Sequence, residues 1–530
     1  MKIATIAPMT YTPGELEYFQ FIRGGVGADY HQGPSFYQFA DGMVRMTWGA
    51  YDFDECSPNV VTLYSDSRDR GLTWSDPQVY MADYPAGPLG GPVLGLSNGS
   101  EAIMYVVQAR HEIEVDETRR VASAGSDYFK TRSHVYIRRS ADGGRTFNHG
   151  RELPWQEITG GKGLPGDGMY YGDVSLVQLQ SGRILAAGDF LDPARSDLAG
   201  GIQHYTGICM ISDDGGHTWR RSAEITVDTL RGVMEMQIVE TAPDQLFCLF
   251  RTKGGCLYQT RSEDGGETWS ASAPSTLPAP ESMARMIRLQ SGNLLVVWNN
   301  VSSTTQQPRH PLAAALSKDG GLSWDTPKVI ADEIGGNQLS NHGLIQLDDG
   351  RILLGISHYR DVRPMTSDLD TAIFDEMWLQ QEYPLPLVWR FRRDPANRGE
   401  DERWFESEPG SEWSDIRTDT DWTSQGHDYH GTAWYSVEFD CPEELDGKDV
   451  MLRFGAVDGI CHIWLDGEQI GAQLQSPEGM WNRPFMIELG ALSSGRKHRL
   501  AVRVTKENHG AGIWKPVGLL ERLRLAFDNR

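Results

Sequence analysis

The order of apolar and polar residues predicts β-strands joined by tight turns, because short apolar runs are broken repeatedly by turns that contain glycine. Val174–Phe190 (VSLVQLQSGRILAAGDF) is typical, with two apolar runs that flank a Gln-Ser-Gly turn. Six such segments occur, at Pro34–Trp48, Pro92–Gln108, Val174–Phe190, Met236–Arg251, Ala284–Trp298 and Gly343–Ser357. We therefore expect a series of repeated hairpins over the N-terminal part of the chain.

A second repeat, Ser-x-Asp-x-Gly-x-Thr-Trp, lies out of phase with these hairpins. Its copies begin at Ser67, Ser140, Ser212, Ser262 and Ser317. The second copy has Phe147 in place of the tryptophan, and the fifth has Ser323 in place of the threonine. The aspartate can accept hydrogen bonds from N–H groups of its own turn, and the glycine tolerates positive φ. We therefore interpret the motif as a structural staple between two strands, and not as a catalytic Ser/Asp pair.

Together the two repeats predict six units of four strands, which is the pattern of a six-bladed β-propeller. The sixth unit lacks the aspartate motif, and we expect Met1–Pro8 to supply a strand that closes the ring. After about Tyr383 the repeats stop, and alternating strands such as Ala433–Phe439 and Leu500–Thr505 follow. The sequence thus predicts two all-β domains, residues 1–383 and residues 384–530.

Composition narrows the classes of function. The 530 residues carry a net charge of -24, so a general nucleic-acid surface is excluded and an anionic ligand needs a local basic pocket. No apolar run is long enough for a membrane span. Met1–Tyr11 lacks the apolar core of a secretory signal, which predicts a cytoplasmic protein, or an extracellular or periplasmic one if a signal has been removed.

Motifs for cofactors are missing from the sequence. The 6 cysteines are scattered without metal spacing, which predicts free thiols in a reducing compartment. No metal-binding, phosphate-loop or nucleophile-elbow motif is found. We therefore expect neither a metal nor an organic cofactor, and the oligomeric state stays open.

Five aspartate motifs at blade spacing resemble the sialidase (neuraminidase) superfamily, in which the motif is called the Asp-box. The C-terminal part resembles the sugar-binding jelly-roll domain of β-galactosidase-type (family 2) glycoside hydrolases. That resemblance rests on Trp389–Pro395 (WRFRRDP), Asp428–Gly431 (DYHG), Ile463–Gly467 (IWLDG) and Gly512–Pro516 (GIWKP). The resemblances imply an all-β chain, a six-bladed β-propeller followed by a β-sandwich (jelly-roll). The second domain then either buttresses the first or binds carbohydrate through aromatic side chains.

Residues at the start of the inner strands converge on one mouth of a propeller, although they lie far apart in the sequence. The candidates in blade order are Tyr30 and His31, Gly91, Tyr170, Tyr171 and Asp173, Glu235, Glu281 and Arg285, and Asn341 and His342. Carboxylates, histidines and arginines in one ring suit an acid–base site with an anion clamp. Arg285 either faces the mouth or forms a salt bridge with Glu281 or Glu235.

The sialidase resemblance implies roles for several of these residues. Glu235 matches the glutamate that polarises the nucleophile, and Arg251 and Arg309 match two arginines that clamp a carboxylate. The first clamp arginine is missing from blade one, so Arg285 is a possible replacement. The tyrosine nucleophile is also missing, since Asn341 and His342 occupy its place. The remaining candidates are Tyr30, Tyr170, Tyr171 or Tyr359 for the nucleophile, and Asp52, Asp54 or Asp173 for the acid.

The resemblance and the residues together predict an exo-acting glycoside hydrolase that removes a terminal, acidic, sialic-acid-like sugar from a glycan. Hydrolysis proceeds by inversion, with two carboxyl groups as acid and base, or by retention with a shifted nucleophile. The predicted catalytic residues are Glu235, Asp52, Asp54, Asp173 and His342, and the predicted substrate-binding residues are Arg251, Arg309, Arg285, His31 and Tyr171. The alternatives are a non-catalytic carbohydrate-binding propeller, or a glycosidase or lyase for rhamnose or a uronic acid on the same fold.

Overall fold

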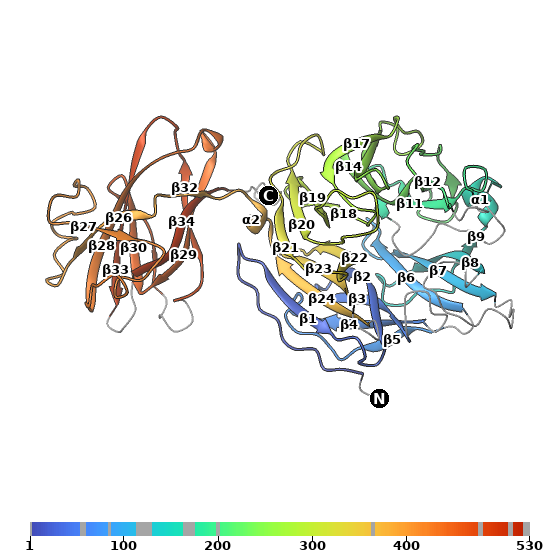
Figure 1. Cartoon of the computed structure of the whole chain (residues 1–530), viewed down its shortest axis with the longest axis horizontal. Coiled ribbons are helices and arrows are strands. Elements are labelled where there is room, and N and C mark those ends of the chain that lie inside the picture. Colours follow the sequence, from blue (N-terminus) through green and yellow to red (C-terminus); the bar gives the residue numbers. More distant parts are fainter. Residues whose placement is uncertain are drawn as a thin grey trace. The chain divides into compact units, whose positions relative to one another are not determined.

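The computed structural model describes residues 3–52, 60–82, 86–112, 130–162, 175–197, 202–361, 366–474, 481–506 and 512–522. The chain forms two compact units (Figure 1). Unit one comprises Met1–Tyr11 and Leu16–Phe374, and unit two comprises Thr12–Glu15 and Asp375–Arg530. The division after Phe374 lies close to the boundary expected after residue 383.

Unit one contains six blades of four strands, and each blade begins with its inner strand. Blades two to five are separate sheets, whereas blades one and six are joined in one eight-stranded sheet by the pairing of Tyr30 with Ser367. Blade one holds β2 (Tyr30–Gln38), β3 (Val44–Tyr51), β4 (Val60–Ser67) and β5 (Gln78–Met81); blade two holds β6 (Ala86–Gly95), β7 (Ala102–Glu112), β8 (Lys130–Ser140) and β9 (Arg151–Leu153). Blade three holds β10 (Ser175–Gln178), β11 (Ile184–Leu191), β12 (Tyr205–Ser212) and β13 (Arg220–Arg221); a short helix α1 (Trp155–Thr159) precedes it. Blade four holds β14 (Met234–Ala242), β15 (Gln245–Arg251), β16 (Cys256–Ser262) and β17 (Ala273–Pro278). Blade five holds β18 (Arg285–Arg288), β19 (Leu294–Asn299), β20 (Leu312–Ser317) and β21 (Lys328–Ala331); blade six holds β22 (Gln338–Gln346), β23 (Ile352–Arg360), β24 (Thr366–Phe374) and β1 (Glu17–Ile22).

The sixth blade takes its outer strand from the beginning of the chain. Strand β1 pairs antiparallel with β24, with Glu17 opposite Ile373. The expectation for Met1–Pro8 was wrong, because residues 3–8 form no strand and β1 supplies the fourth strand instead. Phe21 of β1 is buried against Trp48 and Trp74 of blade one, which gives this strand an apolar anchor. The sixth aspartate motif is missing because no turn joins the third and fourth strands of this blade.

The inner strands follow one another around the middle of unit one (Figure 1). Strands β2, β6, β10, β14, β18 and β22 contact their neighbours in this order, and β22 contacts β2. A cavity of about 470 Å³ lies among them, and its lining includes residues of all six strands. The fold is therefore the six-bladed propeller that the repeats predicted.

The aspartate motifs connect the third and fourth strands of blades one to five. In blade three, Ser212 Oγ accepts the Gly216 N–H at 2.8 Å and donates to Asp214 Oδ1 at 2.9 Å, while Asp214 accepts the Thr218 N–H at 2.8 Å. The other four motifs repeat these three contacts. The motif therefore fixes one turn.

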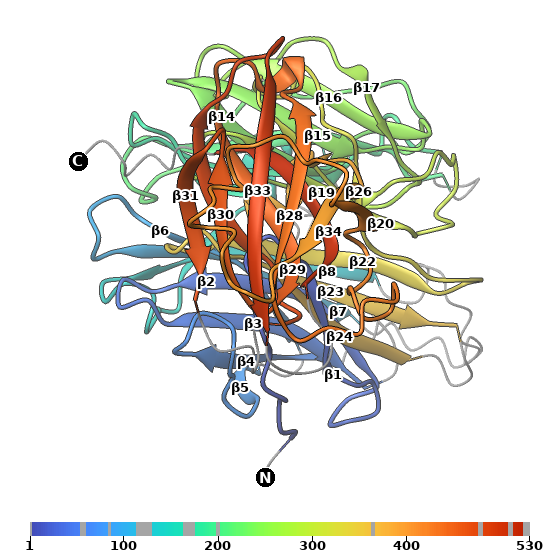
Figure 2. The same cartoon turned by 90° about the vertical axis from the view of Figure 1, so that its left-hand side faces the viewer.

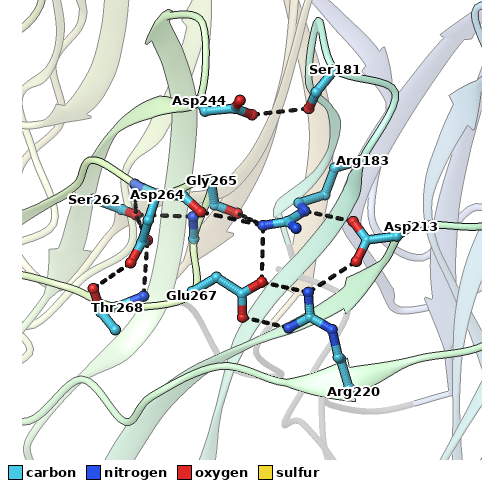
Figure 3. Close-up of polar contacts among 11 residues, drawn as sticks. Ser181, Arg183, Asp213, Arg220, Asp244, Ser262, Asp264, Gly265, Glu267 and Thr268 are labelled. Atoms are coloured by element: carbon cyan, nitrogen blue, oxygen red, sulfur yellow. Dashed lines mark hydrogen bonds and ion pairs between the residues drawn. The ribbon is translucent and has the colours of Figure 1, made fainter.

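Charged residues join neighbouring blades through these turns. Figure 3 shows Arg183 of blade three, which donates to the Gly265 carbonyl in the turn of blade four at 3.1 Å and pairs with Asp213 at 2.6 Å. Arg220 pairs with both Asp213 and Glu267 in the same network. The turn of one blade is thus held by the side chains of the blade before it.

Glutamines at the end of the inner strands make a second kind of tie between blades. Gln178 Oε1 accepts the N–H of Ser97 from blade two at 2.8 Å, and Gln38 Oε1 accepts the N–H of Asp348 from blade six at 2.9 Å. Gln346 Oε1 accepts the Gln290 N–H from blade five at 2.7 Å. Each tie satisfies a hairpin N–H of the preceding blade, so the contacts fix the order of the blades around the ring.

Unit two contains a β-sandwich, as the resemblance implied, and a short helix, α2 (Glu376–Leu379), which precedes the strands of the sandwich. One sheet has the order β25 (Tyr383–Pro384), β34 (Gly512–Glu521), β29 (Asp449–Asp458) and β32 (Phe485–Ala491). The other has the order β27 (Ser414–Arg417), β26 (Val388–Arg393), β28 (Gly431–Asp440), β33 (Lys497–Lys506), β30 (Ile460–Leu465) and β31 (Glu468–Gln473) (Figure 2). Trp389, Trp422 and Tyr435 are fully buried in its core. Among the described residues, no helix has the length and apolar character that crossing a membrane requires.

Candidate active site

In three of the inner strands, a β-bulge near the start places one residue in the left-handed region. These residues are Gly33 (φ 64°), Glu235 (φ 50°) and Asn341 (φ 45°). Glycine adopts this conformation freely, whereas for Glu235 and Asn341 it costs on the order of 1–3 kcal/mol. Bulges of this kind re-aim a side chain and are frequent next to active sites. Glu235 and Asn341 therefore occupy equivalent positions in blades four and six.

Glu235 is held by contacts from two other strands. Its N–H donates to Asp189 Oδ2 at 2.8 Å, and its Oε1 accepts Arg251 Nη1 at 2.8 Å. Asp189 lies on β11 and is buried, so the contact fixes the strained backbone of Glu235 from blade three. Glu235 Oε2 is buried and has no hydrogen-bond partner among the described residues. An ion-paired carboxylate of this kind can accept a proton from a reacting group.

A second buried carboxylate, Glu281, gathers cations from two blades. Its side chain has no exposed surface. Its Oε1 lies 2.5 Å from Arg231 Nη1 and 3.5 Å from Arg251 Nη2, and its Oε2 lies 3.4 Å from Lys253 Nζ. Its carbonyl oxygen accepts Arg309 Nη2 at 3.3 Å. Through Glu281, the structure brings the two predicted clamp arginines, Arg251 and Arg309, into one cluster.

The cluster is locally basic although the chain is strongly acidic. It contains the carboxylates Asp189, Glu235 and Glu281 and the cations Arg231, Arg251, Lys253 and Arg309. The cations outnumber the carboxylates by one, in a chain whose net charge is -24. Glu281 and Arg251 are buried, whereas the side chains of Arg231 and Lys253 are 23% and 25% exposed. The basic groups that reach solvent are therefore supported by a buried carboxylate.

Both predicted site histidines are buried in the blades. Trp48 Nε1 donates to His31 Nδ1 at 3.1 Å, and His31 Nε2 lies 3.1 Å from the Val26 carbonyl. His342 Nε2 lies 3.0 Å from the Val297 carbonyl. Burial lowers the pKa of His31 to about 4 and that of His342 to about 3. The structure thus places both as neutral side chains packed inside the blades, and the catalytic role of His342 and the substrate-binding role of His31 stay predictions.

Arg285 lines the cavity among the inner strands, and its Nε donates to the His342 carbonyl at 2.8 Å. The salt bridge considered for Glu281 is made instead by Arg231, Arg251 and Lys253. Arg285 therefore joins the start of the inner strand of blade five to that of blade six.

Two tyrosines lie beside the position that is equivalent to Glu235 in blade six. Asn341 Nδ2 donates to Tyr359 Oη at 2.9 Å, and the Tyr359 ring lies 5.8 Å from that of Tyr30. Asp52 is exposed and follows Tyr51, which pairs with Tyr30, so it belongs to the same mouth. Of the other predicted residues, Asp54, Tyr170, Tyr171 and Asp173 lie outside the described residues.

A buried cluster in blade six has the residue types of a metal site. Ligand atoms of His358, Asp368 and Asp370 lie within 4.8 Å of one another. However, Asp368 Oδ2 accepts Arg360 Nε at 2.7 Å, and Asp370 Oδ2 accepts Tyr18 Oη at 2.7 Å and faces His358 Nδ1 at 2.8 Å. These hydrogen bonds tie β1 to β24 and account for one oxygen of each carboxylate.

Three charged residues of the site were missed by the sequence reasoning: Asp189, Arg231 and Lys253. Asp189 and Lys253 lie at or just after the end of a second strand, whereas the candidates predicted for the mouth lie at the starts of the inner strands. In an antiparallel hairpin the end of the second strand lies beside the start of the first, so the same mouth also receives residues from the ends of β3, β11, β15 and β23. Charged residues in the last positions of each second strand or directly after it were the available signal, and Asp189 and Lys253 would have been found by it.

Comparison with known proteins supports the fold. The model of the BNR repeat-like domain matches residues 42–354, which is more than half of the chain. A solved structure of a protein of unknown function from Dyadobacter fermentans has a TM-score of 0.54 and 20% identity, over 68% of this chain and 98% of that one. A mutant of NanB sialidase from Streptococcus pneumoniae has a TM-score of 0.51 and 16% identity, over 68% of this chain and 70% of that one.

One curated relative is similar over a shorter stretch. A β-glucuronidase of Paenibacillus borealis is 30% identical over 130 residues. The match covers 22% of this chain and 20% of the relative, so the chain spans about a fifth of that protein's length.

Proposed function

Because the chain belongs to the family of proteins with a BNR repeat-like domain, we propose that it is a glycoside hydrolase that acts at the mouth where Glu235, Arg251 and Arg309 gather. The observation that carries this proposal is the carboxylate of Glu235. The carboxylate pairs with Arg251 at 2.8 Å, and Asp189 of blade three binds the backbone N–H of Glu235. The positive φ of Glu235 costs free energy, and such strained conformations cluster at active sites. The sialidase-like fold of unit one supports the same class of reaction.

The proposed substrate is a glycan with a terminal acidic sugar. The surplus of cations around Glu281 favours a ligand with a carboxylate, since Arg251 and Arg309 can each donate two hydrogen bonds from one guanidinium. A sialic acid and a uronic acid both carry such a group. The name of the Paenibacillus relative, a β-glucuronidase, supports including glucuronic acid among the substrates to be tested.

In the proposed mechanism Glu235 accepts a proton, either from the attacking water or from a nucleophilic hydroxyl. A second carboxyl group, from Asp52, Asp54 or Asp173, protonates the leaving glycosidic oxygen. If the reaction retains configuration, Tyr359 is the candidate nucleophile, since Asn341 donates a hydrogen bond to its Oη at 2.9 Å. That hydrogen bond stabilises a phenolate, which is the reactive form of a tyrosine.

A second candidate function is binding of a carbohydrate without hydrolysis. The observation that favours it is Asn341, which stands at the bulge of blade six where the family resemblance expects a tyrosine. Asparagine can bind sugar hydroxyl groups, but it cannot act as the nucleophile. A glycosidase or lyase for another sugar, such as rhamnose, uses the same fold and is tested by the same experiment.

The test is hydrolysis of a panel of aryl glycosides of sialic acid, glucuronic acid, galactose and rhamnose by the wild-type chain and by Glu235→Gln. We expect release from one acidic member and a loss of kcat of about 10²–10⁴-fold in Glu235→Gln. Glu224→Gln is the matched control, because this glutamate pairs with Lys162 and Arg221 away from the cluster. Release that survives Glu235→Gln would show that another carboxylate is catalytic. Binding of sugars without any release would favour the second candidate function.

A further inference from the structure

One tryptophan of unit two stands out by its exposure. Of the 16 tryptophans, all of which lie among the described residues, Trp481 alone is exposed, at 48% of its surface. Its ring stacks on that of Trp514, with 5.4 Å between the ring centroids and 18° between the ring planes. One indole face is therefore covered by its partner, while much of the Trp481 ring remains open to solvent.

The pair is held rigidly by the neighbouring strand. Trp514 Nε1 donates to the Trp481 carbonyl at 2.7 Å, and Lys515 Nζ donates to the Asn482 carbonyl at 3.5 Å. Both donors lie near the start of β34, so this strand fixes the backbone that carries Trp481. The Lys515 ammonium also lies 5.2 Å from the centre of the Trp514 ring.

A β-bulge explains why Trp514 points to this place. Lys515 pairs with Ala456 and Ile513 pairs with Val457, so Trp514 is the extra residue between two regular pairs. A bulge turns the side chain of the extra residue away from the regular alternation of the strand. The bulge therefore places Trp514 where it supports an exposed aromatic ring. Burial of both rings in the core would stabilise unit two more.

We propose that Trp481 and Trp514 form a carbohydrate-binding site, in which a pyranose ring packs its C–H face against the exposed indole of Trp481. An indole ring offers a flat apolar surface of the size of one sugar ring, and its electron-rich face attracts polarised C–H groups. Polar side chains surround it: Asn482 and Arg483 are exposed, and Lys515 is partly exposed. These groups can bind the sugar hydroxyls, as a specific small-ligand site requires.

The size of the exposed ring favours a sugar over a protein partner. A stable protein interface buries about 800 Å² on each side around a central apolar patch. A single exposed indole bordered by polar residues offers far less apolar surface than that. The site is separate from the cluster around Glu235, and the proposal does not depend on hydrolysis by unit one.

The test is affinity electrophoresis of the full chain through gels that contain soluble xylan, galactan, mannan, hyaluronan or polygalacturonate. All variants carry Glu235→Gln, so that the polysaccharide is not cleaved during the run. We expect retardation by at least one polysaccharide and a loss of affinity of about tenfold or more in Trp481→Ala, as for other aromatic anchors. Trp481→Tyr is expected to keep part of the affinity, because it retains a flat ring.

Val388→Ala is the control, since this valine is 50% exposed on the other sheet of unit two. It is expected to migrate like the parent chain. The proposal is overturned if no polysaccharide retards the parent chain, or if Trp481→Ala is retarded as strongly as the parent. If Trp481→Ala melts at a lower temperature than the parent chain, the affinity of Trp481→Tyr is used to test the proposal instead. A tyrosine variant that is as stable as the parent but has no affinity for the polysaccharide also overturns the proposal. Hydrolysis of aryl glycosides is measured separately, so failure here leaves the proposed function of unit one standing.

Discussion

At the scale of single residues, Glu281 positions the cationic side chains of the candidate site. Its buried carboxylate lies between Arg231, on the segment that leads into blade four, and Arg251 and Lys253, at the end of the second strand of blade four and just after it. Without this carboxylate, the three cations would repel one another in a poorly solvated place. Glu281 is thus a positioning residue, whereas Arg231 and Lys253 reach solvent and can meet an anionic ligand.

This arrangement predicts that Lys253 contributes to the recognition of an acidic sugar. Lys253→Gln is expected to raise the KM for an acidic aryl glycoside about tenfold, the effect of one lost hydrogen bond to a charged group, with a smaller change in kcat. Steady-state kinetics on acidic and neutral glycosides is the measurement. Lys318→Gln is the control, because this lysine is more exposed and pairs only weakly with Asp325, at 3.9 Å. An equal loss for acidic and neutral substrates would contradict the role assigned to Lys253.

Some residues of the site could be predicted from the sequence and others could not. The family resemblance pointed to Glu235, Arg251 and Arg309, and the structure brings these three together. It also pointed to the starts of the inner strands, where His31 and His342 lie, but these side chains face the interior of the blades. Shifting a strand by one residue reverses the direction of every side chain, and the bulges at these positions are such shifts. A bulge leaves no clear mark in a single sequence.

At the scale of elements, the aspartate motif was predictable because all its contacts lie within one turn. Its serine, aspartate and glycine each lie two positions apart along the chain, so the spacing itself specifies the turn geometry. The strand that closes blade six was not predictable in the same way. Its partner β24 lies at the other end of the unit, and the apolar residues of Met1–Pro8 suit a strand as well as those of Glu17–Ile22.

The turn geometry predicts a specific loss of stability. Ser212→Ala removes the acceptor of the buried Gly216 N–H, and a buried N–H without a partner costs about 1–3 kcal/mol. We expect the free energy of unfolding of the full chain, measured in urea, to fall by this amount. Ser100→Ala, at an exposed hairpin serine of blade two, is expected to leave it unchanged within about 0.5 kcal/mol. Equal stability of Ser212→Ala and wild type would show that the motif is not needed to fix the turn.

At the scale of the whole molecule, two neutral histidines buried in the ring make its stability depend on pH. The pKa of His31 is lowered to about 4 and that of His342 to about 3, by burial in both cases and further by Arg285 for His342. Below about pH 6.5 the unfolded chain binds protons on these residues that the folded chain does not bind. The folded state is therefore expected to lose stability as the pH falls from about 6.5 towards 4.

Each histidine is expected to contribute up to about 1.4 kcal/mol per pH unit in this window. His342→Gln and His31→Gln are expected to flatten the fall of the unfolding free energy between pH 6.5 and 4, measured in urea at each pH. His217→Gln is the control, because His217 is exposed. If both buried variants lose stability with pH as steeply as wild type, other groups are responsible for the acid sensitivity.

The repeats predicted the propeller, and the alternating strands after about Tyr383 together with a family resemblance predicted the second all-β unit; the structure confirms the fold class. A propeller repeats one hairpin pattern with few exceptions, so the number of blades can be counted in its sequence. The ties between blades were not foreseen, since Gln178, for example, accepts an N–H from a different repeat. Contacts between repeats depend on the angle between blades, and the sequence of one repeat does not encode that angle.

The pairing of β1 with β24 also affects the order in which the protein can be completed on the ribosome. Glu17 and Ile373 are partners, so roughly 350 residues must be translated between the two strands, which takes about 20–70 s at about 5–20 residues per second. During that time β1 has left the exit tunnel without its partner, and when β24 emerges its edge is open to any strand of the right pattern. Two nascent chains on one messenger RNA would offer each other the same strand, so the joint that closes the ring is also the place where two copies could exchange ends.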